Sequence, residues 1–149
     1  MKIAFDEHIP IQLADACKAL DGEDRLLRVE IVSAREFAVP KAESDVPWLQ
    51  EFAASGGRVV ISGDAKMRGK LHEQKALLEA GFVVFFWDRR WNAENGYVKA
   101  AMLMRWWPYI LEVAENANRG QFFEIPFSWN AVEMREVTPP DGLHMEPMG

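Results

Sequence analysis

The feature that most constrains the fold is a series of short apolar runs alternating with stretches of helical periodicity. Two of these runs, residues 58–62 and 82–87, are rich in Val, Ile and Phe, and each directly follows a glycine. Runs of this kind are typical of strands buried on both faces of a parallel sheet. Strands that alternate with helices therefore predict an α/β fold, a mostly parallel central sheet flanked by helices on both faces.

The remaining elements follow from the same patterning. Further strands are expected at residues 2–5, 26–32 and 122–127. Helices are expected at residues 9–20, 45–55, 71–80 and 95–118. Arg28 and Glu30 alternate out of the second strand, which favours an edge position, and the strand at 122–127 is also expected at an edge. Pro108 is expected to break or restart the last helix.

Length and composition indicate a single folded domain. A chain of 149 residues can bury a sizeable core, and we expect the domain to span residues 1–137. Residues 138–149 show no periodicity and are expected to form a loosely ordered tail. The single cysteine, Cys17, rules out an internal disulfide and fits a reducing cytoplasm. His8, His72 and His144 are too scattered to suggest a zinc site.

The sequence predicts neither a membrane-spanning segment nor a targeting leader. No apolar run approaches the roughly 18 residues that a membrane span needs, and no basic-then-apolar leader precedes Lys2. A cytoplasmic protein is therefore expected. The net charge of −6 argues mildly against nucleic-acid binding, unless the acids are concentrated in a metal site.

Three aspartates occupy related positions. Asp6 directly follows the first strand, Asp64 follows the strand that ends near Ser62, and Asp45 begins the helix that leads into that strand. A right-handed crossover places all three at the carboxyl edge of the sheet. Carboxylates gathered in one crevice are stable together around a hard cation, and oxygen ligands select Mg²⁺ or Mn²⁺. Such a site suits hydrolysis of phosphodiesters.

Each of these acids also has a purely structural interpretation. Asp6 and Asp45 are suitable helix caps, and Asp64 is a common turn residue. Glu7 could belong to the outer shell of a metal site or be a solvated neighbour. Glu73 has the same two interpretations, the second as an ordinary charge on a helix surface.

Basic residues lie beside two of the predicted strand ends. Lys66 and Arg68 follow Asp64 and could contact phosphates, or they could belong to a solvated loop. Arg89 and Arg90 stand between Trp87 and Trp91, an interleaving that could stack and clamp single-stranded RNA. Trp87 is better explained as the end of a buried strand.

A second aromatic cluster lies in the last predicted helix. Residues 106–109 read Trp-Trp-Pro-Tyr. Such a cluster more often packs in a core or forms an oligomer interface, here that of a homodimer, than it stacks on bases.

Three motifs, taken in order, resemble those of a known family. They are Lys2–Pro10 (KIAFDEHIP), Ser44–Trp48 (SDVPW) and Gly57–Asp64 (GRVVISGD). Together they resemble the PIN-like domains of the VapC-toxin-like nuclease superfamily, in its short PIN-like branch, over about residues 1–90. Residues 91–149 match nothing in the family pattern.

The resemblance implies a three-layer, Rossmann-like PIN fold and metal-dependent ribonuclease activity. Asp6, Asp45 and Asp64 would then be the catalytic residues that bind Mg²⁺ or Mn²⁺. RNA would be the substrate, and an antitoxin protein would be a partner if the chain is the toxin of a toxin–antitoxin pair. Many members carry a fourth acid shortly after the third, whereas here the next acid after Asp64 is Glu73.

Two alternatives remain open. A PIN-like scaffold that has lost turnover would act as an RNA- or protein-binding module, which the missing fourth acid favours. A receiver-like phosphoacceptor fold also places acids at strand ends. That fold needs a lysine after a late strand, and none follows residues 82–87.

Overall fold

The computed structural model describes residues 1–6, 8–21, 29–34, 46–63 and 71–137, with the backbone alone at 21 and 71–73. Within these residues one sheet forms, in the strand order β2-β1-β3-β4-β5-β6. The strands are β1 (Lys2–Phe5), β2 (Glu30–Ser33), β3 (Val59–Ser62), β4 (Val83–Trp87), β5 (Phe122–Ile125) and β6 (Arg135–Val137). The first five are parallel and β6 runs antiparallel to β5, which confirms the predicted α/β class.

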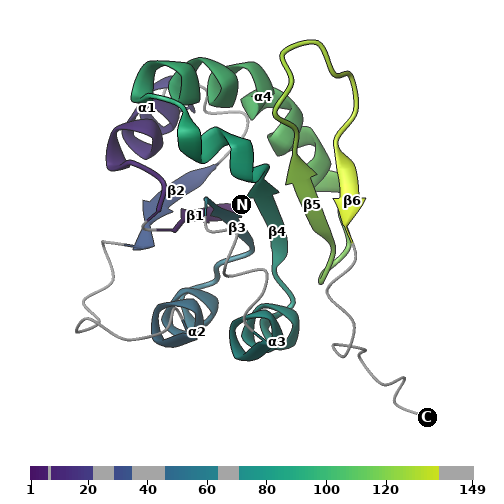
Figure 1. Ribbon diagram of the computed structural model, residues 1–149. Coiled ribbons are helices and arrows are strands. Elements are labelled where there is room, and N and C mark those ends of the chain that lie inside the picture. Colours follow the sequence, from purple (N-terminus) through teal and green to yellow (C-terminus); the bar gives the residue numbers. More distant parts are fainter. Residues whose placement is uncertain (7, 22–28, 35–45, 64–70, 138–149) are drawn as a thin grey trace.

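Helices cover both faces of this sheet. They are α1 (Ile11–Asp21), α2 (Val46–Ala54), α3 (Leu71–Ala80) and α4 (Gly96–Asn116), with a short 3₁₀ helix, η3 (Arg89–Ala93). Figure 1 shows α1 and α4 on one face and α2 and α3 on the other. The result is the three-layer, Rossmann-like arrangement that the sequence predicts.

The sheet separates two apolar cores. Phe5 faces the α1/α4 side, where its ring stacks on Trp107 with centroids 5.7 Å apart. Ala4 faces the α2/α3 side, where Phe52 stacks on Phe82 at 5.5 Å. Because successive side chains of a strand point to opposite faces, the residue after Phe5 is directed to the α2/α3 side.

Several sequence expectations are confirmed at the level of single elements. β3 lies between β1 and β4, as expected for a central strand, and β2 lies at an edge. β2 begins at Glu30, while residues 26–28 of the predicted strand lie outside the described residues. Helices α2 and α3 are followed by Gly56 and Gly81, whose positive φ angles of 91° and 70° suit glycine at a helix end.

Other expectations are wrong. Pro108 does not break α4, because buried residues on both sides of it hold the helix against the sheet and Pro108 itself faces solvent. β5 is not an edge strand, because β6 pairs with it. β6 has only three residues, too few to show a strand pattern in the sequence. Residues 89–93 form η3 rather than a loop.

Among the described helices, none is both long and apolar enough to cross a lipid bilayer.

Candidate functional site at the carboxyl edge of the sheet

The carboxyl edge between β1 and β3 is the point at which the strand order reverses. β2 lies on one side of β1, while β3 and the strands after it lie on the other. In open α/β sheets, ligands bind in the crevice at such a switch point. Asp6 directly follows β1 and Gly63 directly follows β3, so the two residues flank this point.

Asp6 is fully buried at this edge. Its backbone N–H continues the sheet by donating to the Ile61 carbonyl at 3.0 Å. Its carboxylate accepts hydrogen bonds from the Ser62 hydroxyl, from the Gly63 N–H at 3.3 Å and from the His8 N–H at 3.1 Å. The His8 ring is half exposed, and its Nδ1 lies 4.0 Å from Asp6 Oδ2. Burying a carboxylate is costly unless donors surround it, and these donors fix its orientation.

Gly63 is held in place from the neighbouring strand. Its carbonyl accepts from the Trp87 indole Nε1 at 3.0 Å and from the Asn92 amide at 3.4 Å. A Cβ at this position would lie 2.5 Å from the Trp87 ring, so glycine alone fits beside that indole. The end of β3, and with it one donor to Asp6, is therefore fixed by the end of β4 and by η3.

The tryptophans near this edge serve packing. Trp91 is buried, stacks on Trp87 with centroids 5.1 Å apart and donates to the Pro126 carbonyl at 3.2 Å. Trp106 and Trp107 are also buried in the α1/α4 core. The structure thus confirms the packing interpretation of Trp87 and of residues 106–107, and it places Trp91 in the same core.

A further acid lies at the same edge. Asp88 directly follows β4, caps η3 through the Arg90 N–H, and binds the Arg90 guanidinium through both carboxylate oxygens at 3.0 and 2.9 Å. The hydrogen bond from Arg90 holds the pKa of Asp88 below its usual value, although partial burial opposes this shift. The same bond raises the pKa of Arg90. Arg89 and Arg90 are both exposed, and Arg89 makes no ion pair among the described residues.

Sequence reasoning missed Asp88 as an acid of this edge. The signal was available, because Asp88 follows a continuous apolar run as Asp6 and Asp64 do. Its local ion pair with Arg90 explains its presence without a ligand.

Most of the other predicted site residues fall outside the described part of the chain. These are Asp45, Asp64, Glu7, Lys66 and Arg68. Glu73 lies in the first turn of α3, where only the backbone is described. Within the described ranges no three His, Cys, Asp or Glu side chains are grouped closely enough to hold a metal ion. Of the predicted metal ligands, the structure therefore places Asp6.

A buried amide side chain in α3 lowers the stability of the fold. Gln74 lies in α3 at 1% exposure, and neither atom of its amide finds a hydrogen-bond partner among the described residues. One helical turn later, Leu77 packs in the α2/α3 core. An unsatisfied buried amide destabilises a fold.

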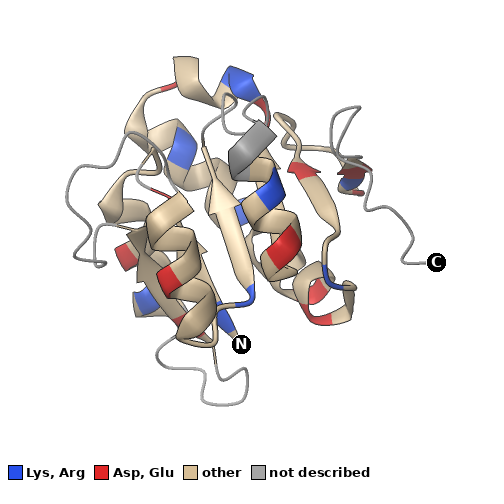
Figure 2. Cartoon of the chain, turned by 90° about the horizontal axis from the view of Figure 1, so that it is seen from below, with Lys and Arg blue, Asp and Glu red and all other residues tan. Residues whose placement is uncertain are grey.

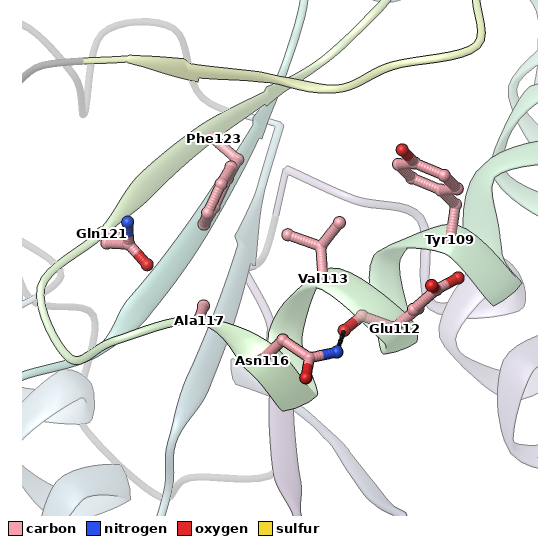
Figure 3. A pocket seen from close by; sticks show the side chains of 7 residues that line it. All are labelled: Tyr109, Glu112, Val113, Asn116, Ala117, Gln121 and Phe123. Carbon is pink, nitrogen blue, oxygen red and sulfur yellow. Dashed lines mark hydrogen bonds between the residues drawn. The ribbon is translucent and has the colours of Figure 1, made fainter.

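A pocket lined by described residues lies elsewhere. A pocket of about 270 Å³ opens between the C-terminal half of α4 and the start of β5. Figure 3 shows Val113 of α4, and Ala117 directly after the helix, facing Phe123 and Gln121 across it. Because β5 is parallel to β4, its start lies at the amino edge of the sheet, opposite Asp6. This pocket is therefore separate from the switch point.

Comparison with known proteins agrees with this geometry. The fold and the buried aspartate define a Rossmann-like α/β domain with a carboxylate at its switch point. A family model described as a PIN like domain matches residues 1–89, and the chain belongs to that family. PIN domains are generally nucleases that use divalent metal ions. No curated protein and no solved structure gives a significant match.

The family match ends at the start of η3. Helix α4 and strands β5 and β6 lie beyond it, although they complete the sheet and one of its cores.

Proposed function

We propose that this protein is a metal-dependent ribonuclease that hydrolyses RNA phosphodiester bonds. The observation that carries the proposal is Asp6, a fully buried carboxylate at the switch point of a PIN-like domain. Its described donors are a hydroxyl and two backbone N–H groups, which hold the carboxylate in position. A buried acid held in this way is costly to keep for folding alone.

The proposed metal ligands are Asp6, Asp45 and Asp64, with Glu7 and Glu73 in the outer shell. Asp6 fits this role because a carboxylate oxygen is a hard ligand suited to Mg²⁺ or Mn²⁺. When bound, the ion supplies positive charge that offsets the negative charge developing on the phosphate during hydrolysis. In the reaction a water oxygen bonds to phosphorus and the water gives up a proton, while the bond from phosphorus to the leaving sugar oxygen breaks and that oxygen takes up a proton, so that the elements of one water are divided between the two products.

Basic side chains would hold the RNA backbone at this edge. Lys66, Arg68, Arg89 and Arg90 are the proposed contacts. Figure 2 shows basic and acidic residues interspersed along the described elements. With a net charge of −6, the chain would have to attract RNA through local cations near the crevice.

The biological setting of such an enzyme is a further part of the proposal. In this proposal the protein acts in the cytoplasm as the toxin of a toxin–antitoxin pair, with an antitoxin protein as its partner. A homodimer is a further proposed assembly.

One observation favours a second function, a binding module without turnover. Asp88 directly follows a strand at the carboxyl edge, as Asp6 does, and could in that position serve as a fourth catalytic carboxylate. Both of its oxygens, however, bind the Arg90 guanidinium. The receiver-like alternative gains no such support, since the residues directly after β4 and β5 are Asp88 and Pro126 rather than lysine.

An RNA cleavage assay separates these functions. Purified wild type, Asp6→Asn and the matched control Asp15→Asn, an exposed position on α1, are incubated with mixed RNA in Mn²⁺ or in EDTA. We expect Mn²⁺-dependent cleavage that falls by about 100-fold or more in Asp6→Asn alone, since even outer-shell changes cost about 10- to 100-fold. Equal cleavage by wild type and Asp6→Asn would contradict the nuclease. RNA binding without cleavage by wild type would favour the module.

A further inference from the structure

We infer that Lys99, in α4, binds a phosphate of the RNA backbone and positions the strand beside Asp6. The inference rests on the proposed nuclease function and extends it to a residue beyond the family match, which ends at residue 89. Lys99 is a positioning residue here, because it acts on the backbone of the substrate and not on the reacting atoms.

A short chain of contacts connects Lys99 to the switch point. The Lys99 ammonium lies over the Trp87 ring, 5.8 Å from its centroid. The Trp87 indole donates to the Gly63 carbonyl at 3.0 Å, and the Gly63 N–H donates to Asp6 at 3.3 Å. One indole ring and one glycine therefore stand between the ammonium and the buried carboxylate.

The start of α4 fixes the position of Lys99. Asn95 caps the helix, with its side chain accepting from the Val98 N–H at 3.0 Å and its carbonyl accepting from the Lys99 N–H at 3.1 Å. Lys99 is half-buried in the first turn. The aromatic face beneath the ammonium orients the side chain further.

The charge of Lys99 is poorly explained by folding. The positive end of the helix dipole lies at the start of α4, and a cation there is unfavourable. No acidic residue occupies the first turn of α4 to offset it. A lysine at this place adds to the positive potential of the helix end, which is the potential that attracts phosphate.

Two arginines of η3 and α4 are already engaged, whereas Lys99, like Arg89, makes no ion pair among the described residues. Arg90 is bound by Asp88, and Arg105 donates to the carbonyl oxygens of Trp129 and Ala131. Among the described residues, no carboxylate lies within ion-pair distance of the Lys99 ammonium. Its positive charge is therefore available for an anion at this edge of the sheet.

A simpler role for Lys99 is to cover Trp87 with its methylene stem. Lys99→Met distinguishes the two roles because it keeps an apolar chain of similar length and removes the charge. Lys99→Arg keeps the charge. Lys75→Met is the matched control, because Lys75 is exposed on α3 and its charge is already paired with Glu79 at 3.8 Å.

The test measures binding of a fluorescent single-stranded RNA of about 12 nucleotides by anisotropy, over a series of salt concentrations. All variants carry Asp6→Asn to prevent cleavage. We expect Lys99→Met to weaken binding about 3- to 10-fold at low salt and to reduce the slope of log K against log salt by about 0.7, the loss of one phosphate contact. Lys99→Arg should restore both quantities, and Lys75→Met should change neither.

Binding by Lys99→Met that equals binding by Lys75→Met in affinity and slope would overturn the inference and leave the nuclease proposal intact. Failure of all variants to bind RNA, together with no cleavage by the wild type, would overturn both. In the cleavage assay, with Asp6 restored, Lys99→Met should raise KM and leave kcat nearly unchanged. A thermal melt of each variant separates loss of binding from loss of folding.

Discussion

At both ends of strand β3 an aromatic ring packs against the backbone of a glycine. At the amino end, a Cβ on Gly57 would lie 2.5 Å from the Phe52 ring, and at the carboxyl end a Cβ on Gly63 would lie 2.5 Å from the Trp87 ring. Each glycine therefore lets an aromatic side chain pack directly on the backbone of the same strand.

The polar groups at the two ends differ. At the amino end the Lys2 ammonium meets the Ser55 hydroxyl at 3.0 Å and Glu30 at 4.0 Å, in contacts open to solvent. At the carboxyl end Asp6 and Ser62 are buried together. Solvated contacts cost little, whereas a buried carboxylate must be held by donors. In the proposed function, the packing serves the fold at the amino end and serves both the fold and the proposed site at the carboxyl end.

Alanine substitutions at the two glycines provide the strongest test of this contrast. Gly63→Ala and Gly57→Ala should each destabilise the protein by about 1 to 3 kcal/mol, because the added methyl group forces an aromatic ring to move. Gly63→Ala should in addition reduce RNA cleavage by about 100-fold, since displacing a site by about 1 Å costs this much. The measurements are thermal unfolding and the cleavage rate at a temperature where both variants are folded.

Gly57→Ala is the matched control in this pair. Equal losses of cleavage in the two variants would show that the fold, and not the carboxyl end, controls the rate. Unchanged cleavage in Gly63→Ala would show that the site does not depend on the contact between Gly63 and Trp87.

A smaller effect is expected at Gln74. Replacing a buried amide that has no described partner by an apolar chain of similar length removes its desolvation cost. Gln74→Met should therefore raise the free energy of unfolding by about 1 kcal/mol, measured in urea. Gln50→Met, at an exposed position of α2, should leave it nearly unchanged. Destabilisation by Gln74→Met would indicate that the amide is satisfied in solution.

The smallest effect is expected at the ion pair after β4. The pKa of Asp88 is lowered in the folded protein, chiefly by its hydrogen bond with Arg90. A lowered folded pKa contributes stability that is present above about pH 4 and is lost as the pH falls through the folded pKa. Arg90→Gln should thus lower the melting temperature slightly near neutral pH and have no effect in acid.

Arg89→Gln is the comparison for this pair, because Arg89 makes no described ion pair and lowers the pKa of Asp88 only through its charge, as the smallest cause, so that its effect should be smaller than that of Arg90→Gln. A difference between wild type and Arg90→Gln that grows on acidification would contradict the assignment.

Most of the fold could be predicted from the sequence, because the patterns that mark its strands and helix ends are local. The run at residues 58–62, bounded by glycines, identifies β3 as a central strand, and Gly56 and Gly81 mark two helix ends. The continuity of α4 through Pro108 could not be predicted, since it depends on packing of both halves against the sheet. β6 has three residues, too few to carry a period.

The site could be predicted in part. The first strand and its terminal acid identify Asp6, and the structure buries it at the expected edge. The contact of Lys99 with Trp87 joins two elements far apart in the sequence, so no spacing reveals it. The convergence of Asp45 and Asp64 on Asp6 remains a prediction, because both lie outside the described residues.

Binding of Mn²⁺ tests the central claim, a metal site around Asp6, most directly. Titration followed by electron paramagnetic resonance measures free Mn²⁺ in the presence of wild type, Asp6→Asn and Asp15→Asn. We predict saturable binding by wild type and Asp15→Asn, and an affinity at least about 10-fold lower for Asp6→Asn. Equal affinity and stoichiometry in all three proteins would contradict a metal site at Asp6.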